Sequence, residues 1–224
     1  VGGKSCFPPQ TQAPVIAARL AKYGVNMLRL HSLDGRYGSL IDSAAGTSQQ
    51  FDADALDRMD CFVAELKKRG IYIYMDLLDY RWFRTADGVK HGDEFTHNWA
   101  GSMKGASIFD ERMIELQKDY ATRLLTHPNP YTGLRYVDDP AVAVVETTNE
   151  NSIFYFFRNR DLSLPYYREE LARRWNAWLA AQYGDRAALA KAWAGDEGFG
   201  ARRPGAAVVS GLLRHPRLHL MSVP

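Results

Sequence analysis

The sequence has few cysteines, no long apolar run and no excess of one charge. Cys6 and Cys61 are too few and too far apart to indicate a disulfide framework or a metal site, so both are expected to be structural thiols. No stretch approaches the roughly 20 consecutive apolar residues of a membrane span. Lys and Arg number 28 against 26 Asp and Glu, a balance too even for a phosphate-binding surface. Neither a membrane span nor a nucleic-acid partner is expected.

Helical and strand patterns alternate along the chain. The expected helices cover residues 12–23, a stretch capped by Asp52 and ended by Gly70, and a stretch capped by Asp110 and ended at His127. The expected strands cover residues 25–31, 71–77 and 141–147, and two more helices are expected over 166–183 and 186–193. Helix and strand in this order predict an α/β fold with a parallel sheet.

A barrel and a doubly wound sheet both satisfy this alternation. The three strands are continuous apolar runs, which is typical of a parallel sheet covered by helices. Glycine-rich phosphate loops of the nucleotide-binding folds are missing after the strands. Polar residues collect instead where the strands end, namely Arg29 and His31, Asp76 and Asp79, and Asn149 and Glu150. Barrel enzymes carry their chemistry at this edge.

The third strand carries the residues best suited to acid catalysis. Cleavage of a glycosidic bond needs a carboxylic acid that protonates the leaving oxygen and a second carboxylate on the opposite side of the sugar. Glu150 suits the first role, and the uncharged amide of Asn149 can hold a sugar hydroxyl. Glu146 lies within the buried strand and needs a partner such as Arg29. On the residues alone, Asn149 and Glu150 equally well cap the segment that follows them.

Several motifs together resemble glycoside hydrolase family 5 and its relatives, the retaining β-glycosidases of the (β/α)8 barrel fold. These motifs are Pro8-Pro9, Gly24-Val-Asn-Met-Leu-Arg-Leu-His31 with Asp34, Gly70-Ile-Tyr-Ile-Tyr-Met-Asp76, Asn129-Pro-Tyr-Thr-Gly133 and Val145-Glu-Thr-Thr-Asn-Glu-Asn151. The resemblance runs from about Pro8 to about Trp193. The Asn-Glu pair at a strand end is its most specific element.

The resemblance implies a role for each strand-end residue. Glu150 takes the position of the general acid/base, and Asn149 that of the residue binding the sugar 2-hydroxyl. Arg29, His31 and Asp34 match residues that line the same subsite. Aromatic side chains in loops after strand ends can stack on sugars or simply pack, and Trp99 is taken as a further substrate contact.

The sequence departs from this family at two places. The family's third strand commonly ends Asp-x-His, whereas Asp76 is followed by two leucines. The family's nucleophile is a Glu at the end of strand seven, and no convincing counterpart is found, because Glu197 follows Glu150 too closely for the strands between them. An incomplete barrel is therefore expected, with strands two to four clearly present and an open edge beside residues 141–147. The barrel domain is expected over residues 1–199, with 200–224 unassigned.

Three functional hypotheses follow. The first is a retaining glycosidase that acts on a β-linked oligosaccharide or polysaccharide without a metal or other cofactor. The second is a catalytically silent carbohydrate-binding remnant, and the third is a truncated enzyme; in either case hydrolysis by the chain alone is expected to be negligible. The resemblance implies an extracellular or periplasmic location, and the oligomeric state is left open.

Overall fold

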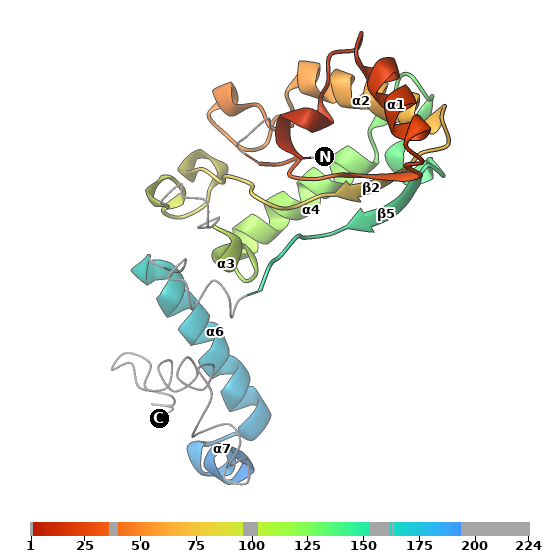
Figure 1. Cartoon of the computed structure of the whole chain (residues 1–224). Helices are drawn as coiled ribbons and strands as arrows, with labels where there is room; N and C mark the ends of the chain where they lie inside the picture. The colour runs from red at the N-terminus through yellow and green to blue at the C-terminus, as the bar shows by residue number, and fades with distance from the viewer. Residues whose placement is uncertain (1, 36–39, 96–102, 153–161, 163, 194–224) are drawn as a thin grey trace. The chain divides into compact units, whose positions relative to one another are not determined.

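The computed structural model describes residues 2–35, 40–95, 103–152, 162 and 164–193 (Figure 1). The chain divides into two compact units, Val1–Ile153 and Phe154–Pro224. Residues 200–224 lie outside the described part of the chain, so a domain boundary near residue 199 stays a prediction.

The first unit contains the three predicted helix-to-strand pairs in the predicted order. The long helices are α1 (Ala13–Lys22), α2 (Ala53–Lys67) and α4 (Glu111–Leu125), and the strands that follow them are β1 (Met27–Leu30), β2 (Tyr72–Asp76) and β5 (Val142–Glu146). Between them lie α3 (Lys104–Ser107), the short hairpin of β3 (Pro128–Asn129) and β4 (Leu134–Arg135), and the 3-10 turns η1 (Gly3–Cys6), η2 (Ser43–Ala45), η3 (Thr85–Asp87), η4 (Gly92–Glu94) and η5 (Tyr136–Asp138). These shorter elements were not predicted because they have too few residues to show a period.

The predicted helix caps form. The Asp52 carboxylate accepts a hydrogen bond from the Ala55 backbone at 2.9 Å, and Asp110 accepts one from Met113 at 2.8 Å. Each bond satisfies a backbone N–H that the first helical turn leaves unpaired. After α2, Gly70 has a φ of 69°, a left-handed conformation that turns the chain into β2 and that glycine adopts readily.

The three strands form one parallel sheet in the order β1-β2-β5. Arg29 pairs with Tyr74 across β1 and β2, and Asp76 pairs with Glu146 across β2 and β5. The N-terminal segment adds an isolated parallel bridge between Gly2 and His31. Within the described residues β5 is an edge strand, as predicted, and the sheet does not close into a barrel.

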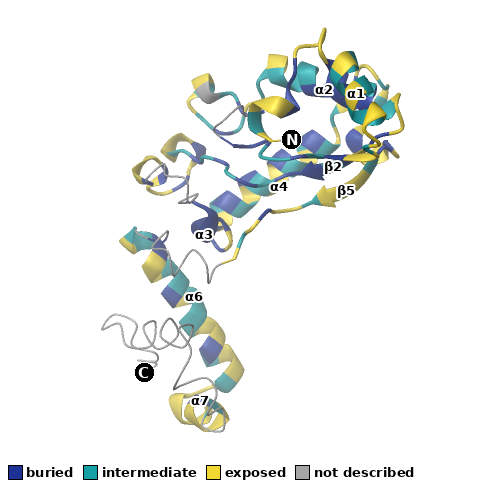
Figure 2. Ribbon diagram, in the orientation of Figure 1, coloured by how far each residue is buried: buried dark blue, intermediate teal, exposed yellow. Residues whose placement is uncertain are grey.

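Within the first unit, the described long helices pack against one face of this sheet (Figure 2). Leu28, Leu30, Ile73 and Met75 are buried in one core with side chains of α1, α2 and α4. On the alternate positions Met27, Tyr72 and Val144 are 39%, 51% and 38% exposed. The expectation of strands buried on both faces is wrong for these residues. Helices on a single face suit the wall of a barrel better than a doubly wound sheet, and the predicted α/β fold with an incomplete barrel is confirmed.

The second unit contains the two remaining predicted helices, α6 (Pro165–Tyr183) and α7 (Arg186–Trp193). Trp175 and Trp178 stack on each other one turn apart on α6, with ring centroids separated by 5.1 Å. The Trp193 indole donates a hydrogen bond to the Tyr183 hydroxyl at 3.2 Å, which ties α7 to the end of α6. In the part of the chain that the structure describes, no helix has the length and apolar character needed to cross a membrane.

Candidate active site

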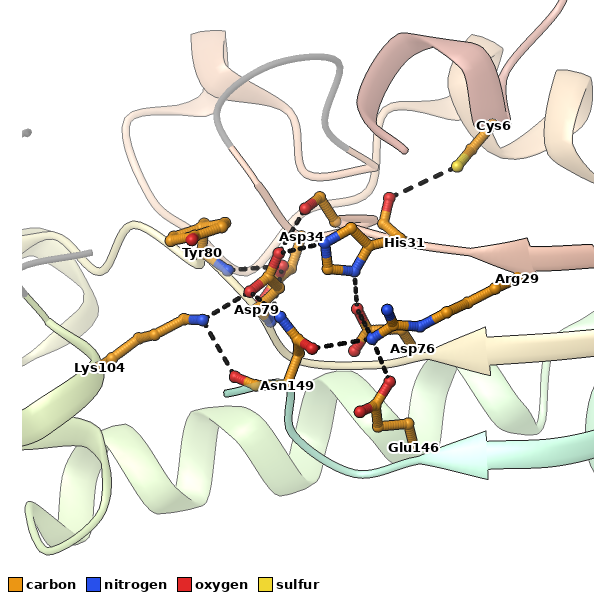
Figure 3. A network of polar contacts seen from close by, with 11 residues as sticks. Cys6, Arg29, His31, Asp34, Asp76, Asp79, Tyr80, Lys104, Glu146 and Asn149 are labelled. Atoms are coloured by element: carbon orange, nitrogen blue, oxygen red, sulfur yellow. Dashed lines mark hydrogen bonds and ion pairs between the residues drawn. The ribbon is translucent and has the colours of Figure 1, made fainter. Parts of the chain in front are cut away.

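Sequence-predicted residues from all three strands meet at the carboxyl edge of the sheet (Figure 3). Because β1, β2 and β5 are parallel, His31, Asp76 and the Asn149–Glu150 corner all follow or end their strands on the same side. The Asn149 backbone N–H also donates to the Leu78 carbonyl at 2.9 Å, which joins the segment after β5 to the segment after β2. The prediction that these strand ends lie together is confirmed.

Arg29 connects the first strand to the third. Its Nη2 atom donates to Glu146 Oε2 at 2.5 Å and to Asn149 Oδ1 at 2.8 Å. The guanidinium carbon lies 5.2 Å from the centre of the Tyr74 ring, in a cation–π contact. The expected pairing of Glu146 with Arg29 is confirmed, so the half-buried carboxylate has a charged partner.

His31 lies between two buried carboxylates. Its Nδ1 is 2.5 Å from Asp76 Oδ2, and its Nε2 is 3.3 Å from Asp79 Oδ2. Asp76 is fully buried, and this burial raises the pKa of its carboxyl group above the usual value. Contacts at both nitrogens fix the plane of the imidazole ring.

Asp79 and Lys104 form a buried ion pair beside His31. Lys104 Nζ donates to Asp79 Oδ1 at 2.6 Å and to the Asn149 carbonyl at 3.0 Å. The Asn149 Nδ2 atom donates to the same Asp79 oxygen at 3.0 Å, and the Ser32 hydroxyl donates to Oδ2. Asp79 therefore connects the ends of all three strands.

Asp34 supports the segment after β2. It is 3% exposed, and its Oδ2 accepts from the Asp79 backbone at 2.9 Å while its Oδ1 accepts from Tyr80 at 3.0 Å. Burial raises the pKa of Asp34 to about 6, although the backbone hydrogen bonds favour the charged form. Its predicted contact with substrate stays a prediction, since both carboxylate oxygens accept hydrogen bonds from the protein backbone.

Asn149 and Glu150 differ in exposure. Asn149 is 7% exposed, whereas Glu150 is exposed and has a φ of 45°. A residue other than glycine seldom adopts this left-handed conformation, and it costs about 1–3 kcal/mol unless the surroundings impose it. The hydrogen bonds on Asn149 hold the corner, and Glu150 is an exposed residue directly after it.

Two residues considered in the sequence analysis lie outside the described part of the chain. They are Trp99, which is predicted to contact the sugar, and Glu197, which was rejected as the nucleophile. The prediction for Trp99 therefore stays open.

The structure adds Lys104 to the site and gives a role to Asp79, which the sequence placed at a strand end without assigning it a function. Asp79 carried a signal, because it is a charged residue just after a strand end. Lys104 carried none, since a single lysine in a short helix is usually solvated.

One group of described side chains has the donor set for a divalent cation. His31, Asp76 and Asp79 each offer a ligand atom, and these atoms lie within 4.8 Å of one another. The cluster already has cationic partners, because Lys104 lies 2.6 Å from Asp79 and Arg29 lies 3.6 Å from Asp76. These ion pairs oppose the binding of a further cation. The expectation that the site works without a cofactor stays a prediction.

Polar side chains gathered at the carboxyl edge of a parallel sheet are the arrangement found at the active sites of α/β-barrel enzymes.

No family model matches the chain. It is 28% identical over 139 residues to mannan endo-1,4-beta-mannosidase 2 of Arabidopsis thaliana, a match that spans 58% of this chain and 30% of that protein. It is 26% identical over 149 residues to mannan endo-1,4-beta-mannosidase 3 of Oryza sativa subsp. japonica, spanning 63% of this chain and 30% of that protein. The predicted resemblance to glycoside hydrolase family 5 and its relatives is confirmed.

Solved structures of similar proteins include two mannanases. The endo-1,4-beta-mannanase of Rhizomucor miehei aligns with a TM-score of 0.48 at 18% identity, covering 66% of this chain and 42% of that one. The endo-beta-1,4-mannanase of Thermotoga petrophila aligns with a TM-score of 0.47 at 19% identity, covering 77% and 38%. The chain thus spans less than half the length of these proteins and about a third of the curated relatives it matches.

Proposed function

We propose that this chain forms the acid/base side of a site that cleaves a β-linked glycan with retention of configuration, and that the glycan is a β-1,4-mannan. The observation that carries the proposal is the Asn149–Glu150 corner, where a buried amide held by Arg29 and Asp79 precedes an exposed glutamate. The names of the curated relatives support mannan as the substrate.

Each residue then has a chemical role. The Glu150 carboxylic acid protonates the leaving glycosidic oxygen as the bond to the anomeric carbon breaks. The Asn149 amide uses one N–H on Asp79 and one lone pair on Arg29. Its second N–H and second lone pair are the groups proposed to bind the sugar 2-hydroxyl.

The proposal assigns no nucleophile. Four other described carboxylates lie at this edge, and each is already engaged: Glu146 by Arg29, Asp76 by His31, Asp79 by Lys104, and Asp34 by backbone N–H groups. Because each of these four groups already has a partner within the protein, none is assigned as the nucleophile. Glycan binding without hydrolysis is therefore the second candidate function.

An external nucleophile tests the acid role directly. The full chain is mixed with phenyl β-mannobioside and sodium azide: azide attacks the anomeric carbon, the bond to phenolate breaks, and Glu150 supplies the proton that the phenol needs. The expected product is the α-glycosyl azide. Glu150→Gln should lower its rate by about 10²- to 10⁴-fold. Glu115→Gln, which alters an exposed glutamate on α4, is the matched control and should keep the full rate.

Binding is measured in parallel by calorimetry with β-1,4-mannohexaose. Saturable binding together with a Glu150-dependent azide reaction supports the proposed function. Binding with no azide product in any variant would replace it with the carbohydrate-binding function. If the wild-type chain neither binds mannohexaose nor forms the azide, both candidates are wrong.

A further inference from the structure

We infer that Lys104 is a positioning residue, which holds the Asn149–Glu150 corner in the conformation that presents the acid/base. This inference rests on the proposed function and adds a residue from outside the strand ends. Lys104 lies on α3, 45 positions before Asn149, and reaches the corner through its ammonium group (Figure 3).

The contact acts on the peptide group that decides where Glu150 points. The Asn149 carbonyl belongs to the same planar peptide as the Glu150 nitrogen, so a donor on that carbonyl fixes the orientation of the plane. Lys104 Nζ is such a donor, at 3.0 Å. Glu150 has its φ of 45° immediately beyond this plane. A left-handed residue other than glycine persists only where its surroundings impose it, and Lys104 is one of the groups that do so.

Lys104 can act in this way because its own position is fixed. Its side chain is 7% exposed, and its ammonium group lies 4.1 Å from the centre of the Tyr80 ring. Asp79 accepts from it at 2.6 Å, and the same carboxylate accepts from Asn149 Nδ2. One ammonium group thus holds the Asn149 backbone directly and the Asn149 side chain through Asp79.

A neutral side chain of similar length separates the charge from the volume. Lys104→Met fills much of the same space but removes both hydrogen bonds. Lys104→Arg retains a donor and a positive charge. Lys67 offers a matched control, because its Nζ donates to the buried carboxylate of Asp139 at 2.9 and 3.0 Å, before β5 rather than after it. Lys67→Met breaks an ion pair to another buried carboxylate, at the other end of the strand.

The first readout needs no substrate. The one-bond coupling between Cα and Hα of Glu150, measured by nuclear magnetic resonance, reports the sign of its φ. We expect the wild-type value to indicate a positive φ, Lys104→Met to shift it towards ordinary negative φ, and Lys104→Arg to restore part of the wild-type value. Lys67→Met should leave the coupling unchanged while lowering stability in urea.

The second readout is the azide reaction. A misplaced acid slows the reaction more than it weakens binding, so kcat for Lys104→Met should fall by about 10- to 100-fold with a smaller change in KM. Lys67→Met should change neither value. If Lys104→Met is too unstable to measure, the double variant Asp79→Asn/Lys104→Met removes both buried charges and should still show the altered Glu150 coupling.

The two readouts separate this inference from the proposed function. A wild-type chain that neither binds nor reacts would refute the function, and the Glu150 coupling would still decide whether Lys104 positions the corner. The inference is wrong if Lys104→Met and the double variant keep the wild-type coupling, or if Lys67→Met changes it equally.

Discussion

The buried carboxyl group of Asp34 makes the stability of the protein depend on pH. It is 3% exposed against the segment after β2, and burial raises its pKa from 3.8 to about 6. The folded protein therefore binds this proton more tightly than the unfolded chain does. Asp34 therefore contributes most to the free energy of unfolding below pH 3.8, and this contribution is lost as the pH rises through about 6.

The size of the effect follows from the pKa. Each pKa unit is worth about 1.36 kcal/mol, so an increase from 3.8 to about 6 corresponds to about 3 kcal/mol of unfolding free energy. Asp34→Asn cannot titrate at this position. The stability of the wild type relative to Asp34→Asn should therefore fall by about 3 kcal/mol between about pH 3.5 and pH 7 and stay level above that range.

The assay is urea unfolding of both proteins at a series of pH values, analysed by linear extrapolation. Subtracting the variant from the wild type cancels the titrating groups that do not interact with Asp34. Asp119→Asn is the matched control, because Asp119 is 52% exposed and pairs with Arg123 on the surface of α4. Its difference from the wild type should stay below about 1 kcal/mol throughout. A wild-type minus Asp34→Asn difference that does not change with pH would refute the reasoning.

Two further substitutions test the framework around the site. Tyr136→Phe removes the hydroxyl that donates to the buried Asp60 carboxylate at 2.5 Å. The free energy of unfolding in urea should fall by about 1.5–3 kcal/mol, as is typical of a hydrogen bond to a charged group. A decrease below about 0.5 kcal/mol would contradict this prediction. Phe62→Ala empties a fully buried position of α2 and should cost about 3–5 kcal/mol, measured in the same way. Val15→Ala, at a half-exposed position of α1, should cost much less than Phe62→Ala.

The sequence alone determined the local structure and the order of the elements. Asp52 and Asp110 predicted the starts of α2 and α4, since a carboxylate before an amphipathic stretch satisfies unpaired N–H groups wherever the helix later packs. The carboxyl ends of parallel strands meet at one edge of a sheet, so the placement of His31 and Asn149 at that edge also followed from the pattern. The pairing of Glu146 with Arg29 was predictable because a half-buried carboxylate needs a partner.

The tertiary structure decided what depends on distant segments. The apolar runs alone could not show that the long helices of the first unit pack against one face of the sheet. Tyr72 and Val144 are residue types that also occur in strands covered on both faces, yet here they are 51% and 38% exposed. Spacing along the chain also could not place Lys104 beside Asp79 and Asn149, because these contacts exist only in the tertiary structure. The partner of a buried charge is decided by distance in the folded protein, whereas the periodicity of a sequence indicates only which face of a helix or strand a residue occupies.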